Sequence, residues 1–106
     1  MKRIEGTWWV KIYISGALSV IEQACRKFCL EEGLCVTVEP TKFIYTGGEE
    51  IGAVIGLVNY PRFPCDRDVI DETAQRLATD ILDSTAQQSV LIMNPDQTAW
   101  WSKRDG

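Results

Sequence analysis

The sequence predicts an α+β protein of the ferredoxin-like class, a βαββαβ two-layer sandwich with an extra C-terminal hairpin strand. Segments with the alternation typical of strands and two segments of helical spacing follow one another in this order. Right-handed crossovers between the strands then place both helices on the same face of the sheet. A length of 106 residues and a hydrophobic share of 45% predict a single domain over residues 1–106.

The first strand and the first helix occupy the N-terminal third of the chain. Residues 7–14 (TWWVKIYI) alternate and are rich in β-branched and aromatic side chains, which indicates a strand. A helix follows, with Ser15 or Ser19 as its N-cap, and Gly33 is a typical residue to end it. Apolar residues recur at helical spacing along this segment, at Leu18, Ile21, Cys25, Phe28 and Cys29.

Two strands joined by a turn come next. Residues 34–38 form a strand that Pro40 interrupts, so it is either an edge strand or two short pieces, continued by residues 42–45. The turn TGGE at 46–49 then leads into a third strand at 50–59.

The C-terminal half contains the second helix and a hairpin. Residues 60–65 form a loop, and Asp66 or Asp68 caps the helix. Residues 89–93 and 98–102 are two short strands that pair around a turn. The apolar stripe of the helix consists of Val69, Ile70, Thr73, Ala74, Leu77, Ala78, Ile81 and Leu82.

Alternation also assigns the two faces of the sheet. On the third strand, Ile51, Ala53, Ile55 and Leu57 should face the helices. The opposite, outer face then carries Trp9, Lys11, Tyr13, Gly52, Val54, Gly56 and Val58. Because the first and third strands are neighbours in this topology, Trp9 and Tyr13 are expected to pack over the gaps that the two glycines leave.

This apolar outer face predicts an interface for self-association, with a dimer favoured, for a protein partner or for a small-molecule ligand. The alternative is that the aromatic rings fold over the glycines and simply shield a solvated sheet. A second candidate is the loop YPRFP at 60–64, in which two prolines restrict the backbone and Arg62 stands between Tyr60 and Phe63. An arginine held among rings can bind a carboxylate or phosphate; alternatively, the two rings only plug an edge of the fold.

The residue types argue against several chemistries. The chain has no histidine, which excludes histidine bases and histidine metal ligands. Its serines therefore have no base to activate them, so no catalytic residue is predicted and the protein is not expected to be an enzyme. Cys25, Cys29, Cys35 and Cys65 form no CxxC pair, and buried thiols are favoured over a metal site. No cofactor or metal is expected.

Charge and hydropathy set further bounds. The net charge is −4 and basic residues occur at most in pairs, which argues against a nucleic-acid partner. The sequence has neither a signal peptide nor an apolar run of membrane-spanning length. A cytoplasmic protein without membrane contact is therefore expected.

Two resemblances add expectations. The words GLCVTV (33–38), FIYTGGEE (43–50) and NYPRFP (59–64) resemble small phage- or prophage-encoded proteins of uncharacterised function, which implies an accessory role in host takeover or anti-defence. Residues 13–38 resemble, at the level of the fold, the first βαβ unit of ACT-type regulatory domains. The functional expectation is a non-catalytic interaction module that uses its outer sheet face; the alternative is an ACT-like sensor with a metabolite bound at a dimer interface.

Overall fold

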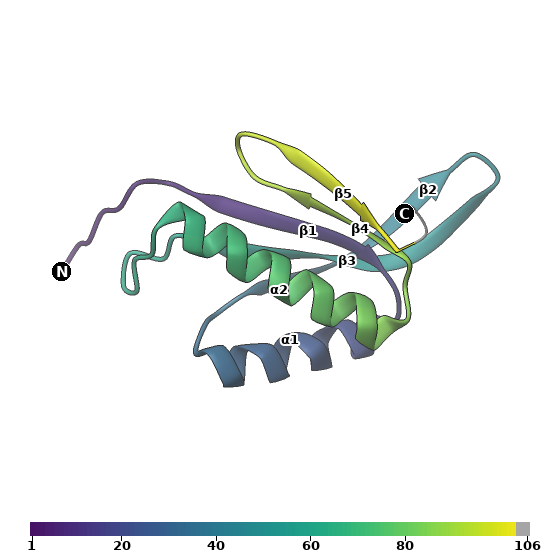
Figure 1. Ribbon diagram of the computed structural model, residues 1–106, viewed down its shortest axis with the longest axis horizontal. Helices are drawn as coiled ribbons and strands as arrows, with labels where there is room; N and C mark the ends of the chain where they lie inside the picture. The colour runs from purple at the N-terminus through teal and green to yellow at the C-terminus, as the bar shows by residue number, and fades with distance from the viewer. Residues whose placement is uncertain (104–106) are drawn as a thin grey trace.

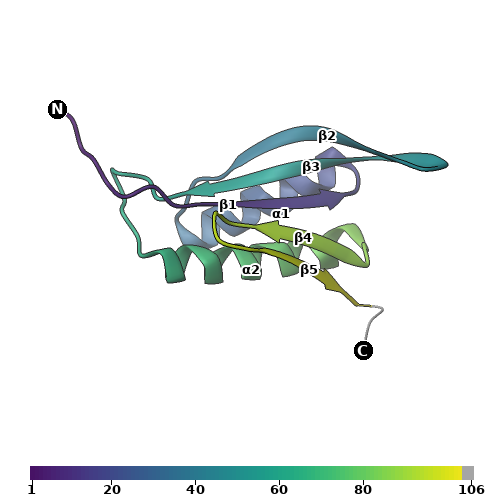
Figure 2. The ribbon, with the colours of Figure 1, turned by 90° about the horizontal axis from the view of Figure 1, so that it is seen from above.

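The computed structural model describes residues 1–103 and has the predicted α+β fold. Its elements are β1 (Trp9–Ser15), α1 (Leu18–Glu32), β2 (Thr37–Tyr45), β3 (Gly48–Val58), α2 (Arg67–Thr85), β4 (Ser89–Met93) and β5 (Thr98–Ser102). The five strands form one antiparallel sheet in the order β2-β3-β1-β4-β5. Both helices cover one face of this sheet and leave the other face open (Figures 1 and 2). Within residues 1–103, neither helix is long and apolar enough to span a membrane.

The hydrophobic core lies between the sheet and the two helices. Alternate residues of β1 and β3 point into it, as the alternation predicted, and Ile12 and Ile55 are completely buried. The predicted stripe of α2 is buried from Ile70 to Leu82, while Val69 remains exposed at its N-terminal end. Burying side chains of this size stabilises the fold by about 1.5–3 kcal/mol each, which is why the stripe decides which face of α2 meets the sheet.

The ends of α1 differ in how well the sequence predicted them. Gly33 has the left-handed backbone expected of a helix-ending glycine (φ 70°), and its N–H donates to the carbonyl of Cys29 at 2.8 Å. The predicted N-caps were wrong, because Ala17 is the N-cap and Ser19 lies inside the helix. Ser15 is the last residue of β1 and instead pairs with Gln87 through side chains 3.4 Å apart.

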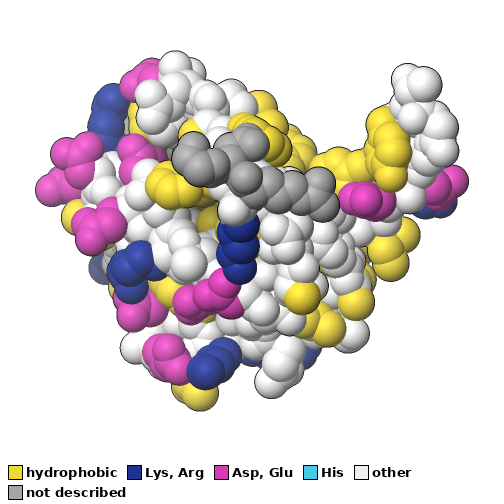
Figure 3. Space-filling model, turned by 45° about the vertical axis from the view of Figure 1, so that its right-hand side comes forward, with side chains coloured by type: hydrophobic (Ala, Val, Ile, Leu, Met, Phe, Trp, Pro, Cys, Tyr) yellow, Lys and Arg dark blue, Asp and Glu magenta, His cyan; other side chains and the backbone are white. Residues whose placement is uncertain are grey.

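Strand β2 runs without a break from Thr37 to Tyr45, through Pro40. It is an edge strand, so the missing N–H of Pro40 costs no hydrogen bond to a neighbour. The far end of the β2–β3 hairpin projects beyond the helices (Figures 1 and 3). For this reason Ile51, predicted to be inward-facing, is 61% exposed, since no helix extends far enough to cover it.

Candidate functional site

The predicted outer-face residues do share the open face of the sheet, but their mutual packing differs from the prediction. In the register, Trp9 stands opposite Val58 and Tyr13 opposite Val54. A side chain at Gly52 would meet the backbone of Ile14 and Ser15 in β1 and the ring of Phe43 in β2, and one at Gly56 would meet the hydroxyl of Thr37 in β2. The prediction that Trp9 and Tyr13 cover Gly52 and Gly56 was therefore wrong, because the β1 backbone and Phe43 occupy the space beside Gly52 and Thr37 occupies the space beside Gly56.

This face remains partly accessible to solvent. Trp9, Tyr13 and Val54 are half-buried, and Val58 is exposed. The ammonium group of Lys11 lies 5.4 Å from the ring centroid of Trp9, within the range of a cation–π contact. A hollow of about 420 Å³ on the same face is lined by Tyr13, Ser15, Phe43, Ser89, Val90, Leu91, Met93 and Trp100.

The second predicted feature, the loop between β3 and α2, is a closed and well-connected turn. The N–H of Phe63 donates to the carbonyl of Tyr60 at 2.8 Å, so the backbone reverses between the two rings. The side chain of Asn59 connects the two ends of the loop to their surroundings. Its Nδ2 donates a hydrogen bond to the carbonyl of Gly6 at 2.8 Å, and its Oδ1 accepts one from the backbone N–H of Cys65 at 2.9 Å. With Pro61 and Pro64 restricting the backbone as well, the loop holds its side chains in a defined arrangement.

The loop forms one wall of a cleft of about 590 Å³, a size typical of small-molecule sites. The rings of Tyr60 and Phe63 lie 6.2 Å apart and are tilted by 34°, and both are exposed at the surface. The remaining walls come from the end of α1, from β3 and from α2. The lining residues are Glu32, Gly33, Leu34, Cys35, Leu57, Val58, Tyr60, Arg62, Phe63, Pro64, Cys65, Val69, Ile70, Thr73 and Arg76.

Three charged side chains line this cleft. Arg76 of α2 binds Glu32 of α1 through atoms 2.9 Å apart and lies 5.6 Å from the ring of Phe28. Arg62 lies 5.4 Å from the ring centroid of Phe63, and no carboxylate within residues 1–103 forms an ion pair with it. The cleft therefore combines two aromatic rings, one neutralised ion pair and one cation without a carboxylate partner.

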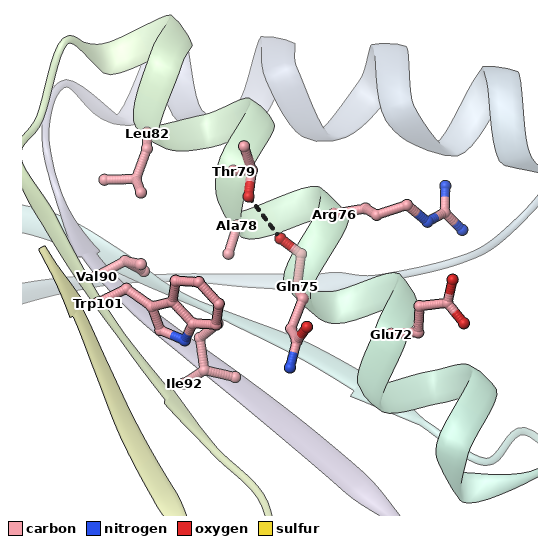
Figure 4. A pocket seen from close by; sticks show the side chains of 9 residues that line it. All are labelled: Glu72, Gln75, Arg76, Ala78, Thr79, Leu82, Val90, Ile92 and Trp101. Atoms are coloured by element: carbon pink, nitrogen blue, oxygen red, sulfur yellow. Dashed lines mark hydrogen bonds between the residues drawn. The ribbon is translucent and has the colours of Figure 1, made fainter. Parts of the chain in front are cut away.

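A smaller hollow of about 210 Å³ lies on the other side of α2, against β4 and β5 (Figure 4). Its walls are mainly apolar, with Trp101, Val90 and Ile92 facing the helix. Glu72 and Arg76 extend away from Trp101, and the hydroxyl of Thr79 already donates to the carbonyl of Gln75 at 3.0 Å (Figure 4). This hollow offers few free polar groups, and its volume is below the usual range for ligand sites.

A more open depression of about 640 Å³ runs along α1. Its lining has neither an aromatic ring nor a carboxylate, being Ser19, Val20, Gln23, Ala24, Arg26, Lys27, Leu30 and Ser84. The cleft beside the loop is the better candidate site, because it combines mainly apolar walls with aromatic and charged groups.

Of the residues that line this cleft, the sequence singled out those of the loop and not those of the helices. Tyr60, Arg62 and Phe63 were predicted together and the structure brings them to one site. Glu32, Thr73 and Arg76 were not predicted, since each reads as an ordinary position on its helix. Glu32 and Arg76 are 44 residues apart, and only the packing of α1 against α2 makes them partners. The interface residues on the outer sheet face lie away from the loop, with the exception of Val58, which also lines the cleft.

The four cysteines have different environments, so the prediction of buried thiols holds only for Cys25. Cys29 is half-buried, and Cys35 and Cys65 are exposed and line the cleft. Burial raises the pKa of the Cys25 thiol from 9.0 to about 11, with smaller contributions from Cys29 and Glu22. Burial likewise raises the pKa of Cys29, with the neighbouring Cys35 adding to it.

These environments predict an order of thiol reactivity. At pH 8 a thiol reagent such as iodoacetamide should label Cys35 and Cys65 first and should reach Cys25 only after denaturation, because the thiolate is the reactive form and Cys25 is both buried and protonated. Peptide mass spectrometry measures this order. Because the folded-state pKa is raised, the stability contribution of Cys25 is complete below pH 9 and is lost as the pH rises toward 11. A Cys25→Ala variant should lack that alkaline component; early labelling of Cys25 in the native protein would contradict the assignment.

Comparison with known proteins gives matches at the level of structure. No family model matches the chain, and no curated protein matches it significantly. A solved structure described as "phage SAM lyase in apo state" superposes with a TM-score of 0.79 and 13% identity, over 98% of this chain and 96% of that one. A second, "phage SAM lyase in complex with S-methyl-5'-thioadenosine", has a TM-score of 0.67 and 9% identity, over 100% and 98%. At these identities the likeness establishes a shared fold.

These findings correct three sequence-based expectations. The expectation of a non-catalytic interaction module or an ACT-like sensor, and of no enzyme, is overturned, since the proteins that share this fold over nearly their whole length are described as a lyase. The resemblance to phage proteins is supported only in its general form, because both structures come from phage proteins. The individual sequence words and the ACT-type resemblance receive no support from them.

Proposed function

We propose that this protein is a lyase that cleaves S-adenosylmethionine (SAM) and releases S-methyl-5'-thioadenosine. The observation that carries the proposal is the fold shared with a phage SAM lyase at a TM-score of 0.79, over 98% of this chain and 96% of the other. The second structure with this fold holds S-methyl-5'-thioadenosine, which is the thioether that remains when the amino-acid arm leaves SAM. The cleft beside the loop is the place in this chain that suits such a ligand.

The chemistry explains how a chain without histidine can be an enzyme. The sulfur of SAM is a sulfonium, so breaking its bond to the amino-acid arm returns the bonding electron pair to sulfur and produces a neutral thioether. This leaving group needs no protonation, and the reaction therefore does not require a general acid. The carbon that loses sulfur is attacked by the carboxylate of the same substrate, so that a C–O bond forms as the C–S bond breaks. The products are then a four-carbon lactone and the thioether.

The cleft has the features that favour this step. Its apolar walls lower the local dielectric constant, which favours the loss of two opposite charges when a sulfonium and a carboxylate are converted into a thioether and an ester. The rings of Tyr60 and Phe63 stand where an adenine ring can stack, and aromatic faces also attract a cation such as the sulfonium. The loop is closed by the Asn59 hydrogen bonds, so the site is largely formed before the ligand binds.

The direct test is to incubate the purified protein with SAM and to follow both products by liquid chromatography and mass spectrometry. We expect S-methyl-5'-thioadenosine and one four-carbon product in equal amounts, at a rate well above that of a protein-free control. The mass of the four-carbon product excludes hydrolysis if no water has been added. S-adenosylhomocysteine is the matched control, since its sulfur is a neutral thioether and should not be cleaved. A folded protein, verified by circular dichroism, that leaves SAM decomposition at the background rate would refute the proposal.

We further propose that the outer sheet face joins two copies of this chain. The face is mostly apolar around β1 and β3, and its charges are self-complementary: Lys11 carries a positive charge, and Glu39, which pairs with Val54 and so shares its face, carries a negative one. A two-fold contact requires such a self-complementary patch.

A Trp9→Glu variant tests this second proposal. The new carboxylate would be buried in the apolar part of the contact, and we expect the mass measured by light scattering to fall from that of a dimer to that of a monomer. Leu30→Glu is the control, because Leu30 is exposed on α1, in the helix layer. The idea of a sheet-face dimer is lost if the wild-type protein is a monomer at 100 µM (roughly a hundredfold above a micromolar Kd) or if Trp9→Glu keeps the wild-type mass.

A further inference from the structure

Arg62 is the unusual charge of the candidate site. The ion pairs within residues 1–103 involve Lys42, Arg67, Arg76 and Lys103, and none involves Arg62. Its contact is with the ring of Phe63, at 5.4 Å from the centroid, which supports the guanidinium from one side and leaves its N–H groups available.

Arg62 gives the cleft one more positively charged side chain than negatively charged ones. Glu32 is the only acidic residue in the lining, and it is already bound by Arg76 at 2.9 Å. A protein with a net charge of −4 thus has a cleft whose lining carries one surplus positive charge. An anionic group on the ligand is what this arrangement would attract.

The loop also holds Arg62 in a limited region. Its neighbour Pro61 has a restricted backbone, and the turn is closed by the hydrogen bond from Phe63 to Tyr60 at 2.8 Å. Arg62 therefore lies beside Phe63, one of the two rings that would hold the adenine ring, with its guanidinium 5.4 Å from the centroid of that ring. A guanidinium so placed recognises a carboxylate with two parallel hydrogen bonds, which a more mobile lysine does less well.

From these observations we infer that Arg62 is the specificity residue that binds the carboxylate at the amino-acid end of the substrate. This inference rests on the proposed function, since it assigns one end of the ligand of that site. In addition, the protein should bind adenosyl ligands that carry an amino-acid carboxylate more tightly than those that lack it. It also places the carboxylate of the ligand at the guanidinium of Arg62 and the adenine ring of the same ligand on the rings of Tyr60 and Phe63.

Two inert ligands that differ only in the carboxylate test the inference. S-adenosylhomocysteine carries it, and 5'-deoxy-5'-(3-aminopropylthio)adenosine is the same molecule without it. By isothermal titration calorimetry, we expect the wild-type protein to bind the first about 10- to 100-fold more tightly, as for a hydrogen-bonded ion pair. In Arg62→Ala the two affinities should become equal, with the affinity for the ligand without a carboxylate unchanged. Arg62→Lys should retain part of the preference, and Arg26→Ala, on the solvent side of α1, should retain all of it.

The outcomes separate the inference from the proposed function. If the wild-type protein binds neither ligand and leaves SAM intact, the proposed function fails. If the wild-type protein cleaves SAM but binds both ligands equally, only the inference about Arg62 is overturned. The same conclusion follows if Arg62→Ala keeps the full preference for the carboxylate, which would point to Arg76 instead, or if it weakens both ligands by the same factor.

Discussion

Replacing Phe63 with alanine is expected to weaken the binding of the adenosyl group by about 5- to 150-fold, which corresponds to the 1–3 kcal/mol that stacking of a base on an aromatic side chain contributes. Phe63 is 70% exposed, so the substitution removes little buried surface and should leave the fold stable. In the proposed function the ring contacts the adenine in both the ground state and the transition state, so the expected change is a higher KM for SAM with a nearly constant kcat. Steady-state kinetics with SAM measures both constants.

Two further variants show whether the ring itself is responsible. Phe63→Leu keeps an apolar side chain of similar reach without an aromatic face, and it should lose most of the affinity that Phe63→Ala loses. Trp101→Ala removes a larger ring from the hollow on the other side of α2 and should leave KM unchanged. A loss of affinity in Trp101→Ala with none in Phe63→Ala would move the binding site from the cleft to the hollow of Figure 4.

Gly52→Ala is expected to destabilise the protein by about 1–3 kcal/mol, the usual cost of forcing extra volume into a packed region. The new methyl group would overlap the carbonyl oxygen of Ile14 and lie 2.7 Å from the Cα of Ser15. Both atoms belong to the backbone of β1, which lies inside the sheet and cannot move aside without disturbing its neighbours. Thermal unfolding measures the loss, at about 4–8 °C for each kcal/mol in a domain of this size.

Gly56→Ala is the matched control on the same strand. Its methyl group would meet only the hydroxyl oxygen of Thr37, at 2.5 Å, and this side chain can rotate away. The substitution also reduces the backbone entropy of the unfolded chain, which favours the folded state by roughly 0.4–1 kcal/mol. We therefore expect a change in stability close to zero. Equal losses in Gly52→Ala and Gly56→Ala would show that the contact with the β1 backbone is not the cause.

The candidate site was predictable only where it is local. The loop from Tyr60 to Pro64 is recognisable in the sequence because its prolines and rings are neighbours along the chain. Arg76 and Glu32 have no such signal, because each looks like a solvated helix position until the helices are packed together. The sequence likewise could not show that Arg62 forms no ion pair within residues 1–103, because this depends on where the acidic side chains lie in space.

The expectation of a non-catalytic protein failed for a chemical reason. The absence of histidine argues against catalysis only for reactions that need a general acid or base, as most enzymatic reactions do. That argument does not apply to a substrate whose leaving group is already a sulfonium, so the composition of the chain could not decide whether it is an enzyme. The finding that contradicts the expectation is the fold shared with a protein described as a phage SAM lyase.

By itself, the sequence determined the order of the elements, the antiparallel ferredoxin-like sheet and the buried faces of β1, β3 and α2. These features follow from the spacing of apolar residues, every second residue in a strand and about every 3.6 residues in a helix. This spacing can be recognised within short stretches of the sequence. Only the tertiary structure shows that Trp9 and Tyr13 do not fill the space beside the glycines, which is occupied by the β1 backbone and Phe43 at Gly52 and by Thr37 at Gly56. It also brings three separate segments together in the cleft. Such contacts depend on strand register and on helix packing, and both are set by the sum of many distant interactions.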